Sequence, residues 1–220
     1  MYGPQAFDIK WVYNFITLYR PPVFKGQRGL LGQVLGGWSF APLFTAQSGV
    51  PLPVSISGGT GNACQSFGEM DCTSVGTANH ENAVALVPYT GGNSAHYNTV
   101  STGAGSSGNA SNGGSGINLF ANPSAVYSGF RRLILGVDTN GGGAGVLRGF
   151  GTFNLDVAVA KDIRIREGIG ATLSFQFINV LNHYQPSNPS LNLDSPGSFG
   201  VVTGQAGTPR QMEFGLRLFF

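Results

Sequence analysis

The last eleven residues of the chain alternate almost throughout between apolar side chains and polar or small ones. Successive side chains of an extended strand point to opposite faces, so this segment would carry an apolar row on one face only. The row consists of Met212, Phe214, Leu216, Leu218 and Phe220. A strand with one apolar face lies between water and either a protein core or membrane lipid. The choice between these two surroundings decides what kind of protein this is.

The low charge content favours lipid. Only 10% of the residues are charged, against about 25% in typical soluble proteins, which cover their outer faces with Lys, Glu and Asp. The 35 glycines and 12 prolines lie mostly between alternating segments and favour turns over helices. No segment approaches the ~20 consecutive apolar residues of a membrane-spanning helix, so a membrane role would require strands. Basic residues are scattered apart from Arg131 and Arg132, and no nucleic-acid partner is predicted.

Four further segments show the same alternation, with uncharged hydrophobic rows opposite small or polar residues. These rows run from Phe7 to Tyr19, from Trp38 to Ala46, from Phe153 to Ile163 and from Ile169 to Phe177. Pro42 removes one donor from the second segment, which predicts a bulge or local irregularity there. Only residues 164–168 separate the third segment from the fourth, so the two are expected to form an antiparallel hairpin. The pattern predicts an all-β, antiparallel fold of about five strands, either in a soluble sandwich or in a partial transmembrane barrel.

The lengths of the connections favour the barrel. Residues 57–150 form one very long connection, which includes a Gly/Ser-rich run at 102–116. Such a loop is unusual in a compact domain, whereas outer-membrane barrels carry long extracellular loops and short periplasmic turns. If the chain ends in the periplasm, the connections 57–150 and 187–207 are extracellular, and the connections 21–36 and 164–168 are periplasmic. Within 21–36, residues 29–35 are expected to form a short turn or helix.

No catalytic group is recognisable. The histidines are isolated, no HExxH or GxSxG motif occurs, and the formal GxGxxG match beginning at Gly103 lies in low-complexity sequence. We therefore expect neither an enzyme nor a metal or cofactor site. Cys64 and Cys72 are predicted to form a disulfide if the protein is exported, and the alternative is two free thiols. Polar-face ion pairs are expected between an acidic residue and a basic one, drawn from Asp156, Asp162, Glu213, Lys10, Arg164 and Arg217.

Five blocks of sequence follow one another in a recognisable order. They are YGP…FD near the start, LGGWSFAPLFTAQSGVPLPV at 35–54, RGFGTFNLDVAVAKDIRI at 148–165, LSFQFINVLNH at 173–183 and FGVVTGQAGTPRQMEFGLRLFF at 199–220. Together they resemble the C-terminal end of TonB-dependent outer-membrane receptors of the Oar-like type. The resemblance covers both ends of the chain and most of the expected strands, and the Gly-rich middle matches nothing in it.

The resemblance implies a bacterial outer-membrane barrel of about 22 strands with a plugged lumen, which imports a bound ligand with energy from the TonB complex. It also implies that the apolar row ending at Phe220 is the signal read by the barrel assembly machinery. This chain has no plug and no N-terminal segment for contact with TonB, and it carries only about five strands. Residues 1–220 are accordingly expected to be a C-terminal fragment of the barrel domain, or a truncated gene, unable to transport alone.

The expected extracellular loops would contribute to capture of an unidentified ligand. Four loop aromatics are candidate contacts for a sugar or a peptide, namely Tyr89, Tyr97, Phe120 and Tyr127. The alternative to a transporter is a soluble or cell-surface structural or adhesive β-domain, in which the Gly/Ser-rich segment is a linker.

Overall fold

The computed structural model describes residues 7–56, 83–98, 100–132 and 146–220. The chain divides into two compact units. Unit 1 comprises Met1–Lys10, Ser48–Gly151 and Gln185–Ala206. Unit 2 comprises Trp11–Gln47, Thr152–Tyr184 and Gly207–Phe220.

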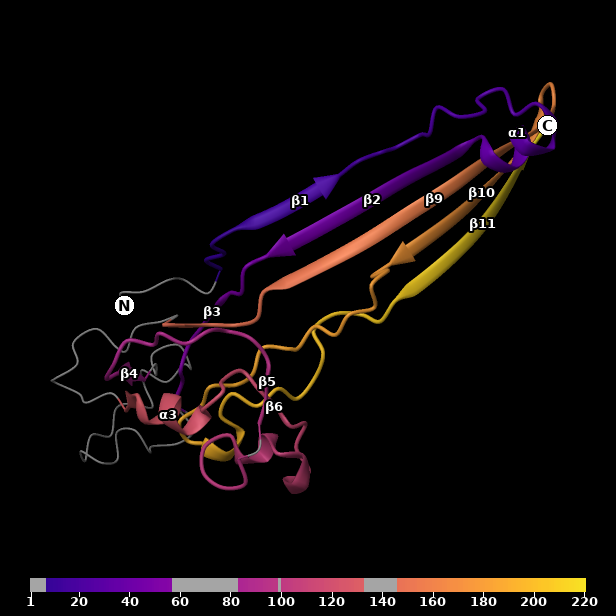
Figure 1. Ribbon diagram of the computed structural model, residues 1–220. Helices are drawn as coiled ribbons and strands as arrows, with labels where there is room; N and C mark the ends of the chain where they lie inside the picture. Colours follow the sequence, from indigo (N-terminus) through magenta and orange to yellow (C-terminus); the bar gives the residue numbers. More distant parts are fainter. Residues whose placement is uncertain (1–6, 57–82, 99, 133–145) are drawn as a thin grey trace, which may run out of the picture. The chain divides into compact units, whose positions relative to one another are not determined.

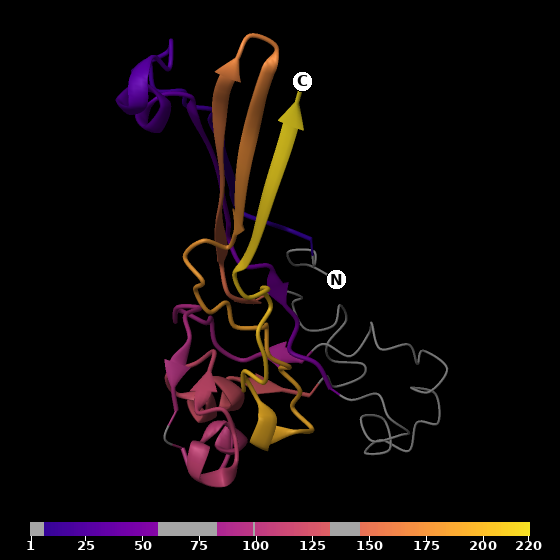
Figure 2. The same cartoon turned by 90° about the vertical axis from the view of Figure 1, so that its right-hand side faces the viewer.

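Unit 2 is built on one five-stranded antiparallel sheet, in which the strands lie side by side in the order β1-β2-β9-β10-β11 (Figures 1 and 2). The strands are β1 (Val12–Ile16), β2 (Trp38–Gln47), β9 (Thr152–Arg166), β10 (Ile169–Ile178) and β11 (Gln211–Phe219). All five strands predicted from the alternation are therefore present. The predicted fold class is confirmed, and the described strands form an open sheet.

The register places the apolar rows of the strands on one face. Phe175 of β10, for example, lies between Val159 of β9 and Phe214 of β11. Phe175 and Phe214 make an edge-to-face contact with ring centroids 5.6 Å apart. We call this the apolar face of the sheet. It contains Tyr13, Phe15, Trp38, Phe40, Pro42, Phe44, Ala46, Phe153, Leu155, Val157, Val159, Ile163, Ala171, Leu173, Phe175, Phe177, Met212, Phe214, Leu216 and Leu218.

Pro42 does not interrupt the sheet, so the predicted bulge is wrong. The register between β2 and β9 continues without a shift through the pair Pro42–Val157. The carbonyl of Pro42 accepts from the N–H of Thr17 at 3.3 Å, on the side of β1. In an antiparallel sheet the N–H and C=O of one residue point toward the same neighbouring strand. The N–H that proline lacks would therefore have pointed toward β1, as its C=O does. The ladder to β9 is therefore intact.

The β9–β10 hairpin is tighter than predicted. β9 extends to Arg166, and only Glu167 and Gly168 form the turn, with Gly168 at a φ of 78°. The register shifts beside the turn, where Ile169 pairs with Arg166 and Gly170 with Arg164. β9 has 15 residues, which exceeds the ~9–11 residues that cross a bilayer at a tilt.

The connection between β1 and β2 contains α1 (Gly29–Leu35), at the span where a short turn or helix was expected. Figure 1 shows α1 at the end of the sheet that also carries the β9–β10 turn and the C-terminus. Of the helices in the described residues, none has the length and apolar character needed to span a bilayer.

Unit 1 consists of short elements. Three two-stranded ladders pair β3 (Pro51–Leu52) with β8 (Leu147–Arg148), β4 (Val84–Ala85) with β7 (Phe130–Arg131), and β5 (His96–Tyr97) with β6 (Ile117–Asn118). The helices are η1 (Ser106–Gly108), η2 (Ala110–Asn112), α3 (Pro123–Ser128) and η3 (Pro196–Ser198). The Gly/Ser-rich run at 102–116 thus carries two helical turns and is not a linker.

Both long connections contribute to one hydrophobic core in unit 1. Leu119 and Leu147 come from the first connection, Phe199 and Val202 come from the second, and all four are completely buried. Phe199 stacks on Phe120 with ring centroids 5.8 Å apart. The described parts of the two connections therefore fold together, because enough apolar side chains meet here to form a core.

Candidate membrane interface

The apolar face of the sheet is a candidate membrane interface. Its side chains on the terminal strand are 55–64% exposed, although every one is a large hydrophobic group. Extensive exposed apolar patches on soluble proteins are uncommon and mark interaction or membrane surfaces. Alternation of an apolar and a polar face on tilted strands is the pattern of a transmembrane barrel wall, with the apolar side turned to lipid.

Tyrosine and tryptophan lie toward both ends of this face. Trp11 and Tyr13 lie at the start of β1, where Val12 pairs with Gln47 at the end of β2. Tyr19 and Trp38 lie at the opposite end, where Tyr19 bridges to Phe40. Transmembrane barrels carry girdles of such residues where the bilayer meets water, because the rings are amphipathic.

One cation interrupts the apolar face. Lys161 of β9 lies opposite Trp38 and Leu173, in a row that is otherwise hydrophobic, yet it is only 5% exposed. Its Nζ donates to the carbonyls of Gln33 at 2.5 Å and Val34 at 3.0 Å and to that of Gly36, all near the C-terminal end of α1. The same Nζ lies 5.0 Å from the centroid of the Trp38 ring. In the sequence, this contact is indicated only by Lys161 itself, which interrupts the apolar row of β9.

The polar face holds its carboxylates with hydrogen bonds. Asp156 accepts from the side-chain amide of Asn154 at 2.7 Å and from the backbone N–H of Asn179 at 2.8 Å. Asp162 accepts from the hydroxyl of Thr172, its cross-strand partner, at 2.8 Å. These are not the partners we predicted, since nearby uncharged donors occupy both carboxylates. The ion pairs recorded among the described residues are Arg132–Asp194 and Arg148–Asp8.

Two asparagines connect the far end of β10 to the segment that enters β11. Asn179 and Asn182 both adopt left-handed backbone conformations, with φ of 52° and 47°, which asparagine tolerates better than most residues. The amide of Asn179 donates to the carbonyl of Thr208 at 2.8 Å. Asn182 accepts from the N–H of Arg210 at 2.9 Å. From the sequence, this NVLNH segment was interpreted only through His183, as a hydrogen-bonded strand cap. The structure gives the capping bonds to the asparagines, while the buried ring nitrogens of His183 have no hydrogen-bond partner among the described residues.

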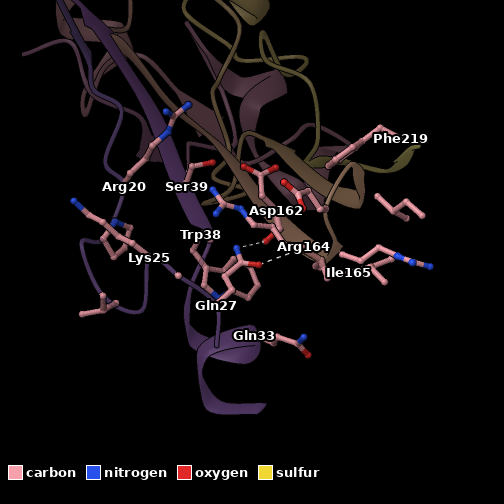
Figure 3. A pocket seen from close by; sticks show the side chains of 18 of the residues that line it. Arg20, Lys25, Gln27, Gln33, Trp38, Ser39, Asp162, Arg164, Ile165 and Phe219 are labelled. Atoms are coloured by element: carbon pink, nitrogen blue, oxygen red, sulfur yellow. Dashed lines mark hydrogen bonds between the residues drawn. The ribbon is translucent and has the colours of Figure 1, made fainter. Parts of the chain in front are cut away.

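The opposite end of the sheet contains a polar groove of about 1010 Å³. Gln27 lines the groove, and its side chain donates to the carbonyl of Asp162 at 2.7 Å and accepts from the N–H of Arg164 at 2.9 Å (Figure 3). Arg20, Lys25, Arg164, Arg166, Asp162 and Glu167 supply the charges along the groove. No residue of this groove was singled out from the sequence as a binding residue.

The predicted assembly residues Met212, Phe214, Leu216 and Leu218 lie together on the apolar face of β11, and Phe220 follows the last residue of the strand. β11 pairs with β10 from Gly170 to Ile178. Its other edge has no partner strand within the residues that the structure describes. Phe220 is fully exposed.

The predicted ligand-contact aromatics separate into two groups. Phe120 is 2% exposed, and Tyr127 packs on Phe199 with its hydroxyl donating to the carbonyl of Leu193 at 2.7 Å. Tyr89 makes an edge-to-face contact with Phe120 at 5.7 Å. These three rings therefore pack in or against the core, and burial makes Phe120 unavailable to a ligand. Tyr97 is 90% exposed and is the one of the four that presents its ring to solvent.

Tyr89 also lines a small cavity of about 180 Å³ with Val87, Val126 and Phe130. Its hydroxyl donates to the carbonyl of Gly92 at 2.6 Å. Burial raises the pKa of the Tyr89 phenol above its ordinary value of 10.0, because the charged phenolate loses hydration there.

Cys64 and Cys72 lie outside the described residues, so their predicted disulfide stays a prediction. Within the described ranges, no three His, Cys, Asp or Glu side chains gather closely enough to hold a metal ion.

A family model described as an outer membrane beta barrel domain matches residues 1–213. Searches of curated proteins and of solved structures found no match. The matched span contains the first four strands of the sheet and enters the fifth, and it accounts for the exposed apolar face and the aromatic residues toward its ends. It locates the protein in the bacterial outer membrane, so the soluble alternative is wrong. The chain belongs to the outer membrane beta barrel domain family.

Proposed function

We propose that this chain is the C-terminal barrel segment of a TonB-dependent transporter of the Oar-like type, importing a ligand still to be identified. The observation that carries the proposal is the common core of the two long connections. Both leave and re-enter the sheet at the same end, where Gln47 pairs with Thr152 and Ile178 with Gln211. A folded unit of this size, built from connections between barrel strands, supports ligand capture better than it supports a simple membrane anchor.

The sheet edges support the part of the proposal that assigns a segment rather than a whole barrel. Within the described residues, β1 and β11 each pair with one neighbour only. Unpaired backbone groups are costly in lipid, which is why membrane-spanning sheets are closed. We propose that further strands pair with both edges and that the 220 residues alone conduct nothing. The TonB complex would act through a part of the receptor outside this chain.

Within unit 1, Tyr97 is the aromatic residue best suited to touch a sugar or peptide. Its neighbour in β5 is His96, which contacts the hydroxyl of Ser94 at 3.3 Å. An exposed ring next to hydrogen-bonding side chains offers an apolar surface and polar groups together, as carbohydrate and peptide ligands require. We propose no catalytic role for any residue of the chain.

The terminal strand is proposed as the element that the barrel assembly machinery reads. Its free edge offers backbone donors and acceptors for strand addition, and alternate side chains set the register. The side chains read would be those of Met212, Phe214, Leu216 and Leu218, with Phe220 at the end.

Import is tested in cells that express the receptor gene to which this chain belongs. The medium contains a maltodextrin ladder and a tryptic digest of casein, and depletion of each component is measured by mass spectrometry. We expect selective depletion that stops when the proton-motive force is abolished with an uncoupler. Binding of a component to the cells without energy-dependent depletion would replace import by the second candidate, a cell-surface adhesive role, which the compact core of unit 1 favours. Depletion that continues after uncoupling would contradict TonB dependence.

A further inference from the structure

The helix α1 has its small residues turned inward and its large ones outward. Gly32 is buried, and a Cβ added there would lie 2.9 Å from the backbone carbon of Gln27. A Cβ added at Gly36, just after the helix, would lie 2.3 Å from the carbonyl oxygen of Phe24. The side of the helix that packs on the protein therefore admits only glycine at these two positions.

The opposite side of α1 is an uncovered apolar stripe. Leu30, Leu31, Val34 and Leu35 are 83%, 70%, 62% and 48% exposed. The spacings of 30 to 34 and 31 to 35 place these side chains on one face of a helix. In water this arrangement reverses the ordinary preference for burying leucine. It is the arrangement expected where the medium outside the protein is itself apolar.

Two residues of the apolar face hold α1 beside the sheet. Lys161 donates from Nζ to carbonyls at the C-terminal end of the helix, and the indole Nε1 of Trp38 donates to the carbonyl of Val34 at 2.9 Å. Lys161 and Trp38 are cross-strand partners on the face that the barrel turns to lipid. The C-terminal end of α1 therefore lies against the membrane-facing surface of the sheet. These donors also satisfy C-terminal carbonyls that would be costly to expose at the edge of a bilayer.

We infer that α1 is an interfacial helix at one end of the barrel wall. Its side chains Leu30, Leu31, Val34 and Leu35 lie at the boundary between phospholipid headgroups and acyl chains. Lys161 is the tether that holds this helix against the sheet, and the contact keeps the ammonium group away from lipid. The inference rests on the outer-membrane family and on the fold of unit 2, and it is independent of the import proposed above.

The depth of α1 is measured on the whole receptor that contains this chain, extracted in folded form from outer membranes and reconstituted in phosphatidylethanolamine–phosphatidylglycerol vesicles. Cys64→Ser and Cys72→Ser remove the native cysteines of the chain. Leu31→Cys then carries an environment-sensitive thiol dye, and Gln33→Cys, at an exposed polar position of α1 that lines the groove, is the matched control. Quenchers are 5-doxyl phosphatidylcholine in the bilayer and iodide in the water.

We expect the dye at position 31 to be quenched at least twofold more strongly than the dye at position 33 by the doxyl lipid, and at least twofold less by iodide. Equal access of iodide to both positions, without doxyl quenching at position 31, would overturn the inference.

The tether is tested with Lys161→Met, which keeps the length of the side chain and removes its charge and donors. Iodide quenching at position 31 is expected to rise at least twofold. Lys25→Met, at an exposed lysine in the same connection, should leave it unchanged. Where Lys161→Met gives no heat-modifiable band on a cold gel, Trp38→Phe replaces it, since this variant keeps an aromatic ring beside Lys161 and removes the bond to Val34. An unchanged quenching profile in a folded tether variant would refute the role of the tether.

Discussion

The side-chain amide of Gln27 donates a hydrogen bond to the backbone carbonyl of Asp162, 2.7 Å away, although 135 positions separate the two residues in the chain. The same amide accepts from the backbone N–H of Arg164 at 2.9 Å. β2 begins at Trp38, opposite Lys161, so β9 continues beyond its neighbour at this point. Gln27 takes the place of the missing strand and satisfies backbone groups that would otherwise form a free edge.

Replacement of Gln27 by alanine should destabilise the sheet by about 1–3 kcal/mol, because it removes two part-buried hydrogen bonds to the backbone of β9, each worth about 0.5–1.5 kcal/mol. The measurement is the urea midpoint of the vesicle-reconstituted receptor that contains this chain, followed by tryptophan fluorescence. Gln33→Ala, on an exposed glutamine of α1, is the control and should leave the midpoint unchanged. Equal midpoints for the two variants would show that Gln27 does not support the edge.

Arginine substitutions on neighbouring residues of β10 test which face meets lipid. Phe175 lies on the apolar face, and Gln176 lies on the polar face opposite Glu213. Phe175→Arg should cost roughly 2–4 kcal/mol if it lies near the bilayer midplane, whereas a lumen-facing arginine costs little. The folded fraction is read from heat-modifiable mobility on cold gels. A larger loss for Gln176→Arg than for Phe175→Arg would reverse the assignment of the two faces.

Truncation of Phe120 should destabilise the core of unit 1 by about 3–5 kcal/mol, as expected when a buried phenylalanine is replaced by alanine. Tyr97→Ala, at the exposed aromatic residue, should leave the core intact and lower ligand uptake instead. Limited proteolysis of the full chain reports the first effect, and depletion of the ligand mixture reports the second. Protease resistance unchanged by Phe120→Ala would mean that unit 1 does not depend on this core.

Ionisation of Tyr89 should lower the stability of unit 1 at high pH. Because the folded-state pKa is raised, the contribution of the neutral phenol is fully present below pH 10 and is lost as the pH rises through the folded-state pKa. A titration followed at 295 nm should show a late phenolate step that Tyr89→Phe removes. If the late step persists in that variant, another tyrosine is responsible.

Deletion of Phe220 tests the proposed assembly signal. The deletion removes no cross-strand pair, since the register of β11 with β10 ends at Phe219. We therefore expect a severalfold loss of folded protein in the outer membrane without a change in the urea midpoint of the protein that does assemble. Arg217→Gln, on the polar face of the same strand, is the control. Normal assembly of the shortened chain would assign Phe220 no signalling role.

The five strands could be predicted because each repeats one physical rule over many residues. In β9 the row from Phe153 to Val159 alternates without interruption, and the hairpin to β10 follows from the short connection. The properties of a single residue were less informative than this repetition. Pro42 predicted an irregularity because proline lacks a backbone N–H, but the missing N–H would have faced β1 and leaves the ladder to β9 intact. Which neighbour it faces depends on the register of β2 with β1 and β9, which one residue does not reveal.

The core of unit 1 could not be predicted from periodicity. Leu119, Leu147 and Phe199 are isolated apolar residues in Gly-, Ser- and Asn-rich surroundings, and they become a core only when two distant connections meet. The tether was missed for a related reason. Lys161 breaks the pattern of β9, but its partners are backbone carbonyls of another element, which carry no sequence signal.

The shared core of unit 1 also limits how such a barrel can be re-engineered. Phe199 of the second connection fills the space between Phe120 and Tyr127 of the first. A graft that moved only the first connection to another barrel would therefore leave a cavity between Phe120 and Tyr127. Recombination that changes ligand specificity would have to transfer both connections together.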